Sequence, residues 1–201
     1  MPKIRADLDI IQRWIKPRST VLDLGCGDGT LLKELSEQLG VQGYGLEIEA
    51  ENITRCIQSG INVIQYDLND GLKDFNADAF DYVIMTQTLQ AINRPDLLLK
   101  EMLRVGRQGI VTFPNFGHWS ARVQLALGGH MPVTRNIPNE WYNTPNTHLC
   151  TLKDFEVLCK DKSIRILQRC VVNYAHRSTT ATRFLPGLLG EIALYRFERL
   201  G

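Results

Sequence analysis

Three groups suited to holding a nucleoside follow one another at short intervals in the first third of the chain. A glycine-rich turn places Gly25, Gly27 and Gly29 in a G-x-G-x-G pattern, and acids follow at Glu47 and Asp67. Glycines let the backbone approach a ligand closely and turn sharply into a helix. A carboxylate at a strand end can accept hydrogen bonds from both ribose hydroxyls, and a second one can accept from the adenine amino group. Together the three groups predict an adenosyl-binding site.

Each group also has a plainer interpretation. The glycines can form an ordinary tight turn, Glu47 can be a solvated acid at a strand end, and Asp67 can close an Asx-turn. A dinucleotide site is a further alternative, but its G-x-G-x-x-G fingerprint needs a third glycine where this chain has Thr30. The pattern therefore favours S-adenosylmethionine (SAM) over a dinucleotide, whose pyrophosphate must lie on the helix.

Apolar segments alternate with helical patterns, and these elements must bring the three groups together. The predicted strands are residues 20–25, 43–48, 61–67, 80–86 and 108–115. The predicted helices are residues 4–16, 31–39, 50–60 and 95–105. This alternation is typical of βαβ units and a parallel sheet covered on both faces. The three groups then lie at the carboxyl ends of strands, where open α/β sheets bind ligands.

The last third of the chain has a different pattern. Residues 116–149 combine a short amphipathic stretch, 119–127, with a segment rich in Gly, Pro and Asn. Connections in compact domains usually run about 4–6 residues, so we expect this long segment to be a lid over the methyl-donating side. A helix is expected at 152–160, and strands at 163–172 and 191–199 are expected to form an antiparallel hairpin at a sheet edge.

Between the two last strands, residues 174–190 are expected to form a loop. It contains the sequence RFLPGLLG, in which apolar residues bracket a Pro-Gly turn: Phe184, Leu185, Leu188 and Leu189. We expect these side chains to pack on the core of the chain, whereas several of them exposed together would mark an interface.

The segments VLDLGCGDG, GYGLEI and NVIQYDL resemble the first three motifs of class I SAM-dependent methyltransferases. The resemblance implies a Rossmann-like α/β fold with helices on both faces of a seven-stranded, mostly parallel sheet of order 3-2-1-4-5-7-6, in which strand 7 is antiparallel. It implies that Asp23 and the Gly25–Gly27 backbone hold the methionine part of SAM or of its product S-adenosylhomocysteine, Glu47 the ribose and Asp67 the adenine. The other implied cofactor-binding residues are Cys26, Ile48, Leu68, Thr86 and Gln87.

Longer segments elsewhere carry a narrower resemblance. They are FDYVIMTQTLQAI, FPNFGHW, MPVTRNIPNEWYNTPNTHLCTLKDFEVLC and IALYRFER, and they resemble the methionine biosynthesis protein MetW family. This resemblance implies association with homoserine O-acyltransferase, the enzyme that activates homoserine for methionine synthesis. In some bacteria that acyltransferase needs its MetW partner for activity. The resemblance implies no particular methyl acceptor.

Methyl transfer needs an acceptor held in line and sometimes a base that removes its proton. The segment after the fourth strand, TQTLQ, lacks the Asn/Asp-Pro-Pro-aromatic string typical of amino-group methylation. After the fifth strand, His118 can act as a base or cap the helix that follows, and capping is favoured because no nearby acid orients the ring. Three aromatic residues can wall an acceptor site or pack within the lid: Trp119, Trp141 and Tyr142. His148 and Cys150 lack a second ligand pair, so no metal site is expected.

Composition narrows the class of protein. With 201 residues, of which 44% are hydrophobic, the chain is expected to be one domain, 1–201. A net charge of +1 without a dense basic face argues against a nucleic-acid partner. No apolar run approaches the roughly 20 residues that a membrane span needs. Five cysteines without a C-x-x-C pair, and no signal peptide, favour a cytoplasmic location.

Two functions follow from these patterns. The first is a SAM- or S-adenosylhomocysteine-binding protein of methionine biosynthesis that acts as a partner or activator of homoserine O-acyltransferase. The second is a SAM-dependent methyltransferase acting on an unidentified small molecule. The residues do not decide between a regulatory and a catalytic role, because a fold by itself does not fix an activity.

Overall fold

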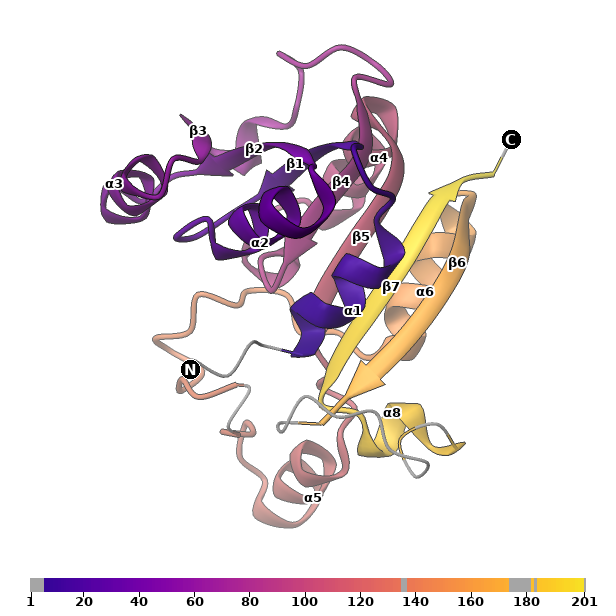
Figure 1. Ribbon diagram of the computed structural model, residues 1–201. Helices are drawn as coiled ribbons and strands as arrows, with labels where there is room; N and C mark the ends of the chain where they lie inside the picture. Colours follow the sequence, from indigo (N-terminus) through magenta and orange to yellow (C-terminus); the bar gives the residue numbers. More distant parts are fainter. Residues whose placement is uncertain (1–5, 135–136, 174–181, 183, 201) are drawn as a thin grey trace.

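The chain folds around a seven-stranded sheet with the strand order β3-β2-β1-β4-β5-β7-β6 (Figure 1). This computed structural model describes residues 6–134, 137–173, 182 and 184–200. The strands are β1 (Thr20–Leu24), β2 (Gln42–Glu47), β3 (Asn62–Gln65), β4 (Phe80–Thr86), β5 (Gly106–Pro114), β6 (Ile164–Val172) and β7 (Ile192–Arg199). Strand β7 is antiparallel to both of its neighbours, and the other pairs are parallel. The predicted strand order, with its antiparallel seventh strand, is confirmed.

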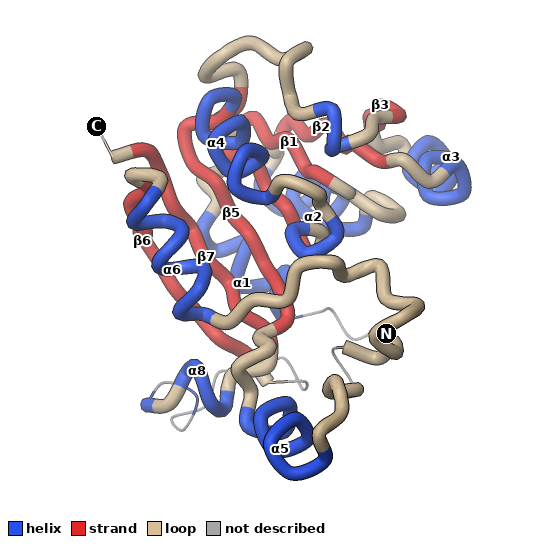
Figure 2. The backbone as a smooth tube through the Cα atoms, turned by 180° about the vertical axis from the view of Figure 1, so that it is seen from behind, coloured by secondary structure: helices blue, strands red, loops and turns tan. Residues whose placement is uncertain are grey.

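Helices cover both faces of the sheet, as predicted. The helices that the structure describes are α1 (Ala6–Trp14), α2 (Thr30–Leu39), α3 (Ala50–Gln58), α4 (Pro95–Val105), α5 (Trp119–Gly128), α6 (Leu152–Asp161) and α8 (Pro186–Leu189). One apolar cluster joins α1 and α2 to one face, and a second joins α4 and α6 to the other. Figures 1 and 2 show these two layers from opposite sides. Burial of whole leucine and phenylalanine side chains between the layers stabilises the sheet by about 1.5–3 kcal/mol each.

The register of the parallel strands aligns their carboxyl ends. Leu24 lies opposite Leu46 in the neighbouring strand, and Glu47 lies opposite Gln65 in the next. The turn after β1 is tied to the same edge, because the amide of Gly25 donates a 2.8 Å hydrogen bond to the Leu46 carbonyl. The ends of β1, β2 and β3 therefore present their turns side by side, as the alternation of elements predicted.

Two short 3-10 turns follow the strands at this edge, and neither was predicted. They are η1 (Leu68–Asp70), which follows β3, and η2 (Leu89–Ala91), which follows β4. Turns of this length bury one or two side chains each, here Leu68 in η1 and Leu89 with Gln90 in η2. Three-residue turns have no hydrophobic periodicity that a sequence pattern can reveal.

The predicted loop over residues 174–190 is wrong in part. Residues 186–189 form the short helix α8, which begins with a proline as helices commonly do. The side chain of Asn115 holds it in place, because its Nδ2 donates to the Gly187 and Gly190 carbonyls at 3.0 and 2.7 Å. Residues 174–181 and 183 of that prediction lie outside the described residues, as do residues 4 and 5 of the predicted first helix.

The apolar residues of RFLPGLLG do not pack as one group. Leu188 and Leu189 are half-buried, whereas 82% of Phe184 and 54% of Leu185 is exposed. The expectation that all of them pack on the core is therefore wrong for Phe184 and Leu185. Asn115 anchors the backbone of α8 at the end of the sheet, so the residues before Pro186 extend beyond the core.

Among the described helices, none combines the length with the apolar character that crossing a bilayer would require.

Candidate functional site

The glycine turn after β1 adopts a backbone that favours glycine at every second position. Gly25, Gly27 and Gly29 have φ angles of 70°, 57° and 79°. A side chain at Gly25 would also collide with its surroundings, since its Cβ would lie 2.7 Å from Thr88 Oγ1. The left-handed backbone thus favours glycine at all three positions, and the close approach of Thr88 is a second constraint at Gly25.

Glu47 is buried at the end of β2 and faces the glycine turn. Its Oε2 accepts a 2.8 Å hydrogen bond from the Gly27 amide, and its Oε1 accepts from the amides of Ile48 and Glu49 at 2.9 and 3.0 Å. A carboxylate has about four acceptor positions, and backbone amides take three of those of Glu47. Glu47 therefore fixes the turn and retains one acceptor position on Oε2. The interpretation of Glu47 as a merely solvated acid does not hold, because the residue is 7% exposed.

Asp67 caps the η1 turn. Its Oδ1 accepts from the backbone amide of Asn69 at 2.9 Å and from Asn69 Nδ2 at 3.0 Å. The Asx-turn that the sequence offered as the plainer interpretation is thus present. The residue is exposed at the mouth of the site, and no hydrogen bond to its Oδ2 is formed within the described part of the chain. One face of the carboxylate is structural and the other is available to a ligand.

A cavity of about 240 Å³ lies between the glycine turn, the end of β2 and the turns η1 and η2. It is lined by Gly25, Leu46, Glu47, Ile48, Tyr66, Asp67, Leu68, Asn69, Thr88, Ala91 and Ile92. The structure therefore brings together five of the residues that the sequence singled out as cofactor-binding. These are Gly25, Glu47, Ile48, Asp67 and Leu68. We call this space the adenosyl cavity, after the ligand that the sequence predicts for it.

The other five candidates lie around the cavity without lining it. Asp23 is buried in β1, opposite Gly45 and Ile84 of the neighbouring strands. Gly27 contributes the amide that binds Glu47. Thr86 ends β4, and the backbone amide of Gln87, at a φ of 55°, donates to the Thr112 carbonyl at 2.9 Å.

Cys26 points away from the cavity. Its Sγ lies 3.8 Å from the Sγ of Cys56 in α3, behind the glycine turn. Burial raises the pKa of both thiols, and the Asp23 carboxylate raises that of Cys26 further. Cys26 thus packs the glycine turn against α3 and does not line the cavity. The spacing of glycines could not reveal this, since it does not fix the direction of the side chain between them.

Sequence reasoning missed several residues that line the cavity. Ala91 comes from η2, Thr88 and Ile92 from the residues that flank it, and Tyr66 and Asn69 from the segment around Asp67. The sequence position of Thr88 could have revealed it, because Thr88 is the second residue after the end of β4 and follows the predicted Thr86 and Gln87. Tyr66 is held by a 2.9 Å hydrogen bond from its hydroxyl to Asp74, and burial together with that carboxylate raises its pKa to about 12.

The chemistry of the lining suits an adenosyl group and not a pyrophosphate. Among the described residues that line the cavity, the charged ones are the acids Glu47 and Asp67. Ile48, Leu68 and Ile92 supply apolar walls for a purine ring. The start of α2, where a dinucleotide would place its pyrophosphate, is taken by Asp28, whose Oδ1 accepts from the Thr30 amide at 3.1 Å. A hydrogen bond from the Thr30 hydroxyl is the main cause of the lowered pKa of Asp28.

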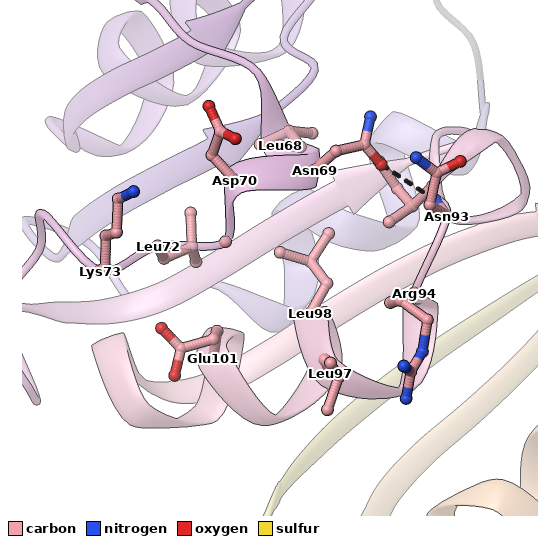
Figure 3. A pocket seen from close by; sticks show the side chains of 12 residues that line it. Leu68, Asn69, Asp70, Leu72, Lys73, Asn93, Arg94, Leu97, Leu98 and Glu101 are labelled. Carbon is pink, nitrogen blue, oxygen red and sulfur yellow. Dashed lines mark hydrogen bonds between the residues drawn. The ribbon is translucent and has the colours of Figure 1, made fainter.

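A second cavity, of about 310 Å³, adjoins the first. It shares Leu68, Asn69 and Ile92 with the adenosyl cavity and extends between the segment after η1 and the start of α4. Figure 3 shows the leucines of this second cavity between the segment after η1 and the start of α4. A hydrogen bond from the Asn93 amide to Asn69 Oδ1 lies at one end of the cavity. The shared residues therefore form the wall between the two cavities.

No base for methyl transfer is evident on the turns after β4 and β5, within the described residues. His118 is the N-cap of α5, and its Nδ1 accepts from the Ser120 amide at 3.4 Å and meets the Ser120 hydroxyl at 2.8 Å. The capping interpretation is confirmed. Burial lowers the pKa of His118, while Glu191 opposes that shift. Trp141 and Tyr142 contact each other edge to face and are 71% and 70% exposed; neither lines the adenosyl cavity.

A seven-stranded sheet of this order, with such a cavity at the carboxyl ends of its first strands, defines a protein of the class I methyltransferase fold. Solved structures agree. A SAM-dependent methyltransferase from Mesorhizobium loti superimposes with a TM-score of 0.71 over 96% of this chain and 98% of its own, at 15% identity. A phosphoethanolamine N-methyltransferase from Haemonchus contortus, solved with SAM, gives 0.68 over 97% of this chain and 52% of its own, at 14% identity. At these identities the likeness shows the fold alone.

The family is shown by sequence. Residues 5–197 match the model of the methionine biosynthesis protein MetW, and the chain belongs to that family. It is 40% identical over 205 residues to the bifunctional methionine biosynthesis protein MetXA/MetW of Rhodopirellula baltica. That match covers 98% of this chain and 33% of the relative, so the chain spans about a third of the relative's length.

Proposed function

We propose that the chain binds SAM or S-adenosylhomocysteine in the adenosyl cavity and acts as a partner of homoserine O-acyltransferase in methionine biosynthesis. The observation that carries the binding half is the convergence of Glu47 and Asp67 on one cavity beside the glycine turn. Glu47 would accept from a ribose hydroxyl with its remaining acceptor position. Asp67 would accept from the adenine amino group, while Ile48 and Leu68 contact the ring. When bound, SAM supplies a transferable methyl group on a sulfonium.

The partner half rests on the relative from Rhodopirellula baltica, whose name couples MetXA to MetW in one protein. Two domains that work together are often joined in one chain, because the link raises their effective concentration for each other. We take the remaining length of that relative to hold the acyltransferase. The same association would bring an acyltransferase against the domain formed by the present chain.

Exposed apolar residues on α5 and just before α8 suit such a partner, and both helices lie at the lower end of the molecule in Figure 1. Within α5, all of whose residues the structure describes, Ala121 alone is buried. The exposed apolar residues of α5 and of the segment before α8 are Trp119, Val123, Leu125, Leu127, Phe184 and Leu185. Both views place α5 and α8 near one another below the sheet. Exposed apolar residues that gather on one side of a protein mark interaction sites, so we propose this set as the docking site and name it the α5–α8 surface.

The test is an acylation assay with purified homoserine O-acyltransferase of the same organism. The proposal predicts that the chain binds the acyltransferase in a pull-down and changes its rate of acyl transfer to homoserine. S-adenosylhomocysteine should alter that effect, because a ligand shifts a complex when it binds its two states unequally. Absence of both binding and rate change would remove the partner role and leave the ligand site untouched.

A pair of matched variants localises the interface. Leu127→Ser removes an apolar side chain that is 85% exposed on the α5–α8 surface, and Ile57→Ser removes one that is 65% exposed on α3. Neither change opens a core cavity. Leu127→Ser is expected to weaken the complex and Ile57→Ser to leave it intact. Equal effects of the two variants would show that the partner docks elsewhere.

A methyltransferase acting on a small molecule is the second candidate. Its support is the same adenosyl cavity, together with partial likeness to methyltransferases such as nocamycin O-methyltransferase of Saccharothrix syringae, 30% identical over 136 residues and 59% of this chain. The absence of an evident base on the described turns weakens it. Incubation of a metabolite extract with methyl-labelled SAM and the chain, followed by mass spectrometry, would reveal a labelled product if the chain is such an enzyme.

A further inference from the structure

The η2 turn and the residues that flank it contact two different parts of the molecule. On one side Thr88, Ala91 and Ile92 line the adenosyl cavity. On the other side the turn is bonded to the end of the long segment between α5 and α6. The Gln90 carbonyl accepts from the His148 amide at 3.0 Å and from the Thr147 hydroxyl at 3.3 Å. A movement of the turn at the cavity is therefore also a movement at this segment.

The ring of His148 makes a further contact with the residues that follow η2. Its Nε2 lies 3.2 Å from the Asn93 carbonyl oxygen, so the nitrogen must carry the hydrogen and donate. The amide of the same Asn93 donates to Asn69 Oδ1 at 3.0 Å, the bond drawn in Figure 3. Asn69 in turn donates to Asp67 from its amide and from Nδ2.

These bonds form a continuous path from the long segment to a wall of the cavity. It runs from His148 through Asn93 and Asn69 to Asp67. Figure 2 shows the segment crossing the molecule between α5 and α6, below the strand ends. Elsewhere along the segment Ile137 is buried, whereas Trp141 and Tyr142 are exposed. The two hydrogen bonds of His148 attach the C-terminal end of the segment to η2 and to Asn93, beside the cavity.

We propose that His148 is a positioning residue of the adenosyl site, holding the η2 turn against the cavity so that an adenosyl ligand, once bound, steadies the described residues 129–134 and 137–149 of the segment between α5 and α6. The inference rests on the proposed adenosyl binding and adds to it a route by which the ligand acts at a distance. It also explains how binding in the cavity can reach a partner on the α5–α8 surface, because the same segment starts at the end of α5. Coupling of this kind is reciprocal: a partner that steadies the segment tightens ligand binding by the same factor.

The chain offers a matched control within the same segment. His148→Ala removes the ring bond to Asn93, whereas His130→Ala removes an exposed histidine for which the structure shows no bond to η2. His148→Gln keeps a donor of similar reach and is expected to restore function. Asn69→Ala cuts the path at its other end.

The experiment combines calorimetric titration of S-adenosylhomocysteine with hydrogen exchange of residues 129–149, measured with and without that ligand. In the wild-type protein the ligand is expected to slow exchange of the segment. His148→Ala and Asn69→Ala should bind roughly twofold to tenfold more weakly, the range for one lost hydrogen bond, and should lose the slowing. His130→Ala and His148→Gln should behave as wild type.

The outcomes separate the two claims. If the wild-type protein binds and His148→Ala matches it in affinity and in slowed exchange, the positioning role of His148 is refuted and adenosyl binding stands. If the wild-type protein shows no heat of binding at all, adenosyl binding is refuted and this inference falls with it. If His130→Ala fails as His148→Ala does, the effect belongs to the segment in general, which also refutes the specific role.

Discussion

Gly25→Ala is expected to destabilise the protein and disturb the adenosyl cavity, whereas Gly60→Ala should have a smaller effect on stability and none on the cavity. The two glycines have nearly the same backbone, with φ angles of 70° and 74°. A Cβ at Gly60 would meet nothing within 4 Å, but a Cβ at Gly25 would lie 2.7 Å from Oγ1 and 3.1 Å from Cγ2 of Thr88. The pair therefore separates backbone strain from crowding.

The magnitudes follow from these two terms. The left-handed backbone costs alanine roughly 1–2 kcal/mol at either position, partly offset by about 0.4–1 kcal/mol from a stiffer unfolded chain. Crowding adds about 1–3 kcal/mol at Gly25 alone, because Thr88 must move. Thr88 lines the cavity, so its displacement should also weaken ligand binding. Adding Thr88→Ala removes both close contacts and should recover much of the crowding term.

Urea unfolding of the single and double variants, analysed as a double-mutant cycle, measures the coupling between Gly25 and Thr88. Titration of S-adenosylhomocysteine into the same proteins measures the effect on the cavity. Equal destabilisation by Gly25→Ala and Gly60→Ala, or a coupling near zero, would show that Thr88 does not press against the glycine turn.

Three further predictions test other parts of the structure. Hydrogen bonds from Arg94 and Lys162 hold the pKa of Asp96 below its ordinary value of 3.8, so the carboxylate stabilises the fold above that pH. Asp96→Asn should lower the free energy of unfolding by roughly 0.5–1 kcal/mol at pH 7, and by progressively less as the pH falls below 3.8. Urea titrations that show the same loss of unfolding free energy at every pH would contradict this prediction. Asn115→Asp should cost about 3 kcal/mol in the same assay, since it turns an acceptor toward two carbonyls, and a loss under ~1 kcal/mol would argue against the anchoring of α8. Glu47 retains one acceptor position, so it can accept from one ribose hydroxyl of S-adenosylhomocysteine. Of the 2′-deoxy and 3′-deoxy forms of this ligand, the one that lacks the bonded hydroxyl should bind roughly tenfold or more weakly, and the other should lose much less affinity. Equal losses of affinity by calorimetry would refute the inference that a single acceptor position remains.

Much of the fold and part of the site could be predicted from the sequence. Strands such as β1 and β4 are largely buried, so they appear as mostly apolar runs that a pattern can detect, each with a single aspartate. The parallel order then places Glu47 and Asp67 at one edge, whatever their local surroundings. The turn at Gly25 could likewise be predicted from the sequence, because a left-handed backbone favours glycine.

The rest depends on contacts between segments that are distant in sequence. The wall formed by Asn69 exists because the Asn93 amide, 24 residues away, donates to its side chain. The helix α8 lies where Asn115 captures its carbonyls across 72 and 75 residues. Nothing in a local pattern encodes such pairings. The direction of Cys26 toward Cys56 is of the same kind, since it follows from the packing of α3 beneath the turn.

The central claim is that an adenosyl group binds beside Glu47, and one comparison tests it most directly. S-adenosylhomocysteine is titrated by calorimetry into the wild-type protein, into Glu47→Gln and into Glu49→Gln, the same substitution at an exposed acid two residues away. Wild type and Glu49→Gln are expected to bind alike, and Glu47→Gln at least roughly tenfold more weakly, as for the loss of a charged hydrogen bond. Undiminished binding by Glu47→Gln, or no binding by the wild-type protein, would contradict the account.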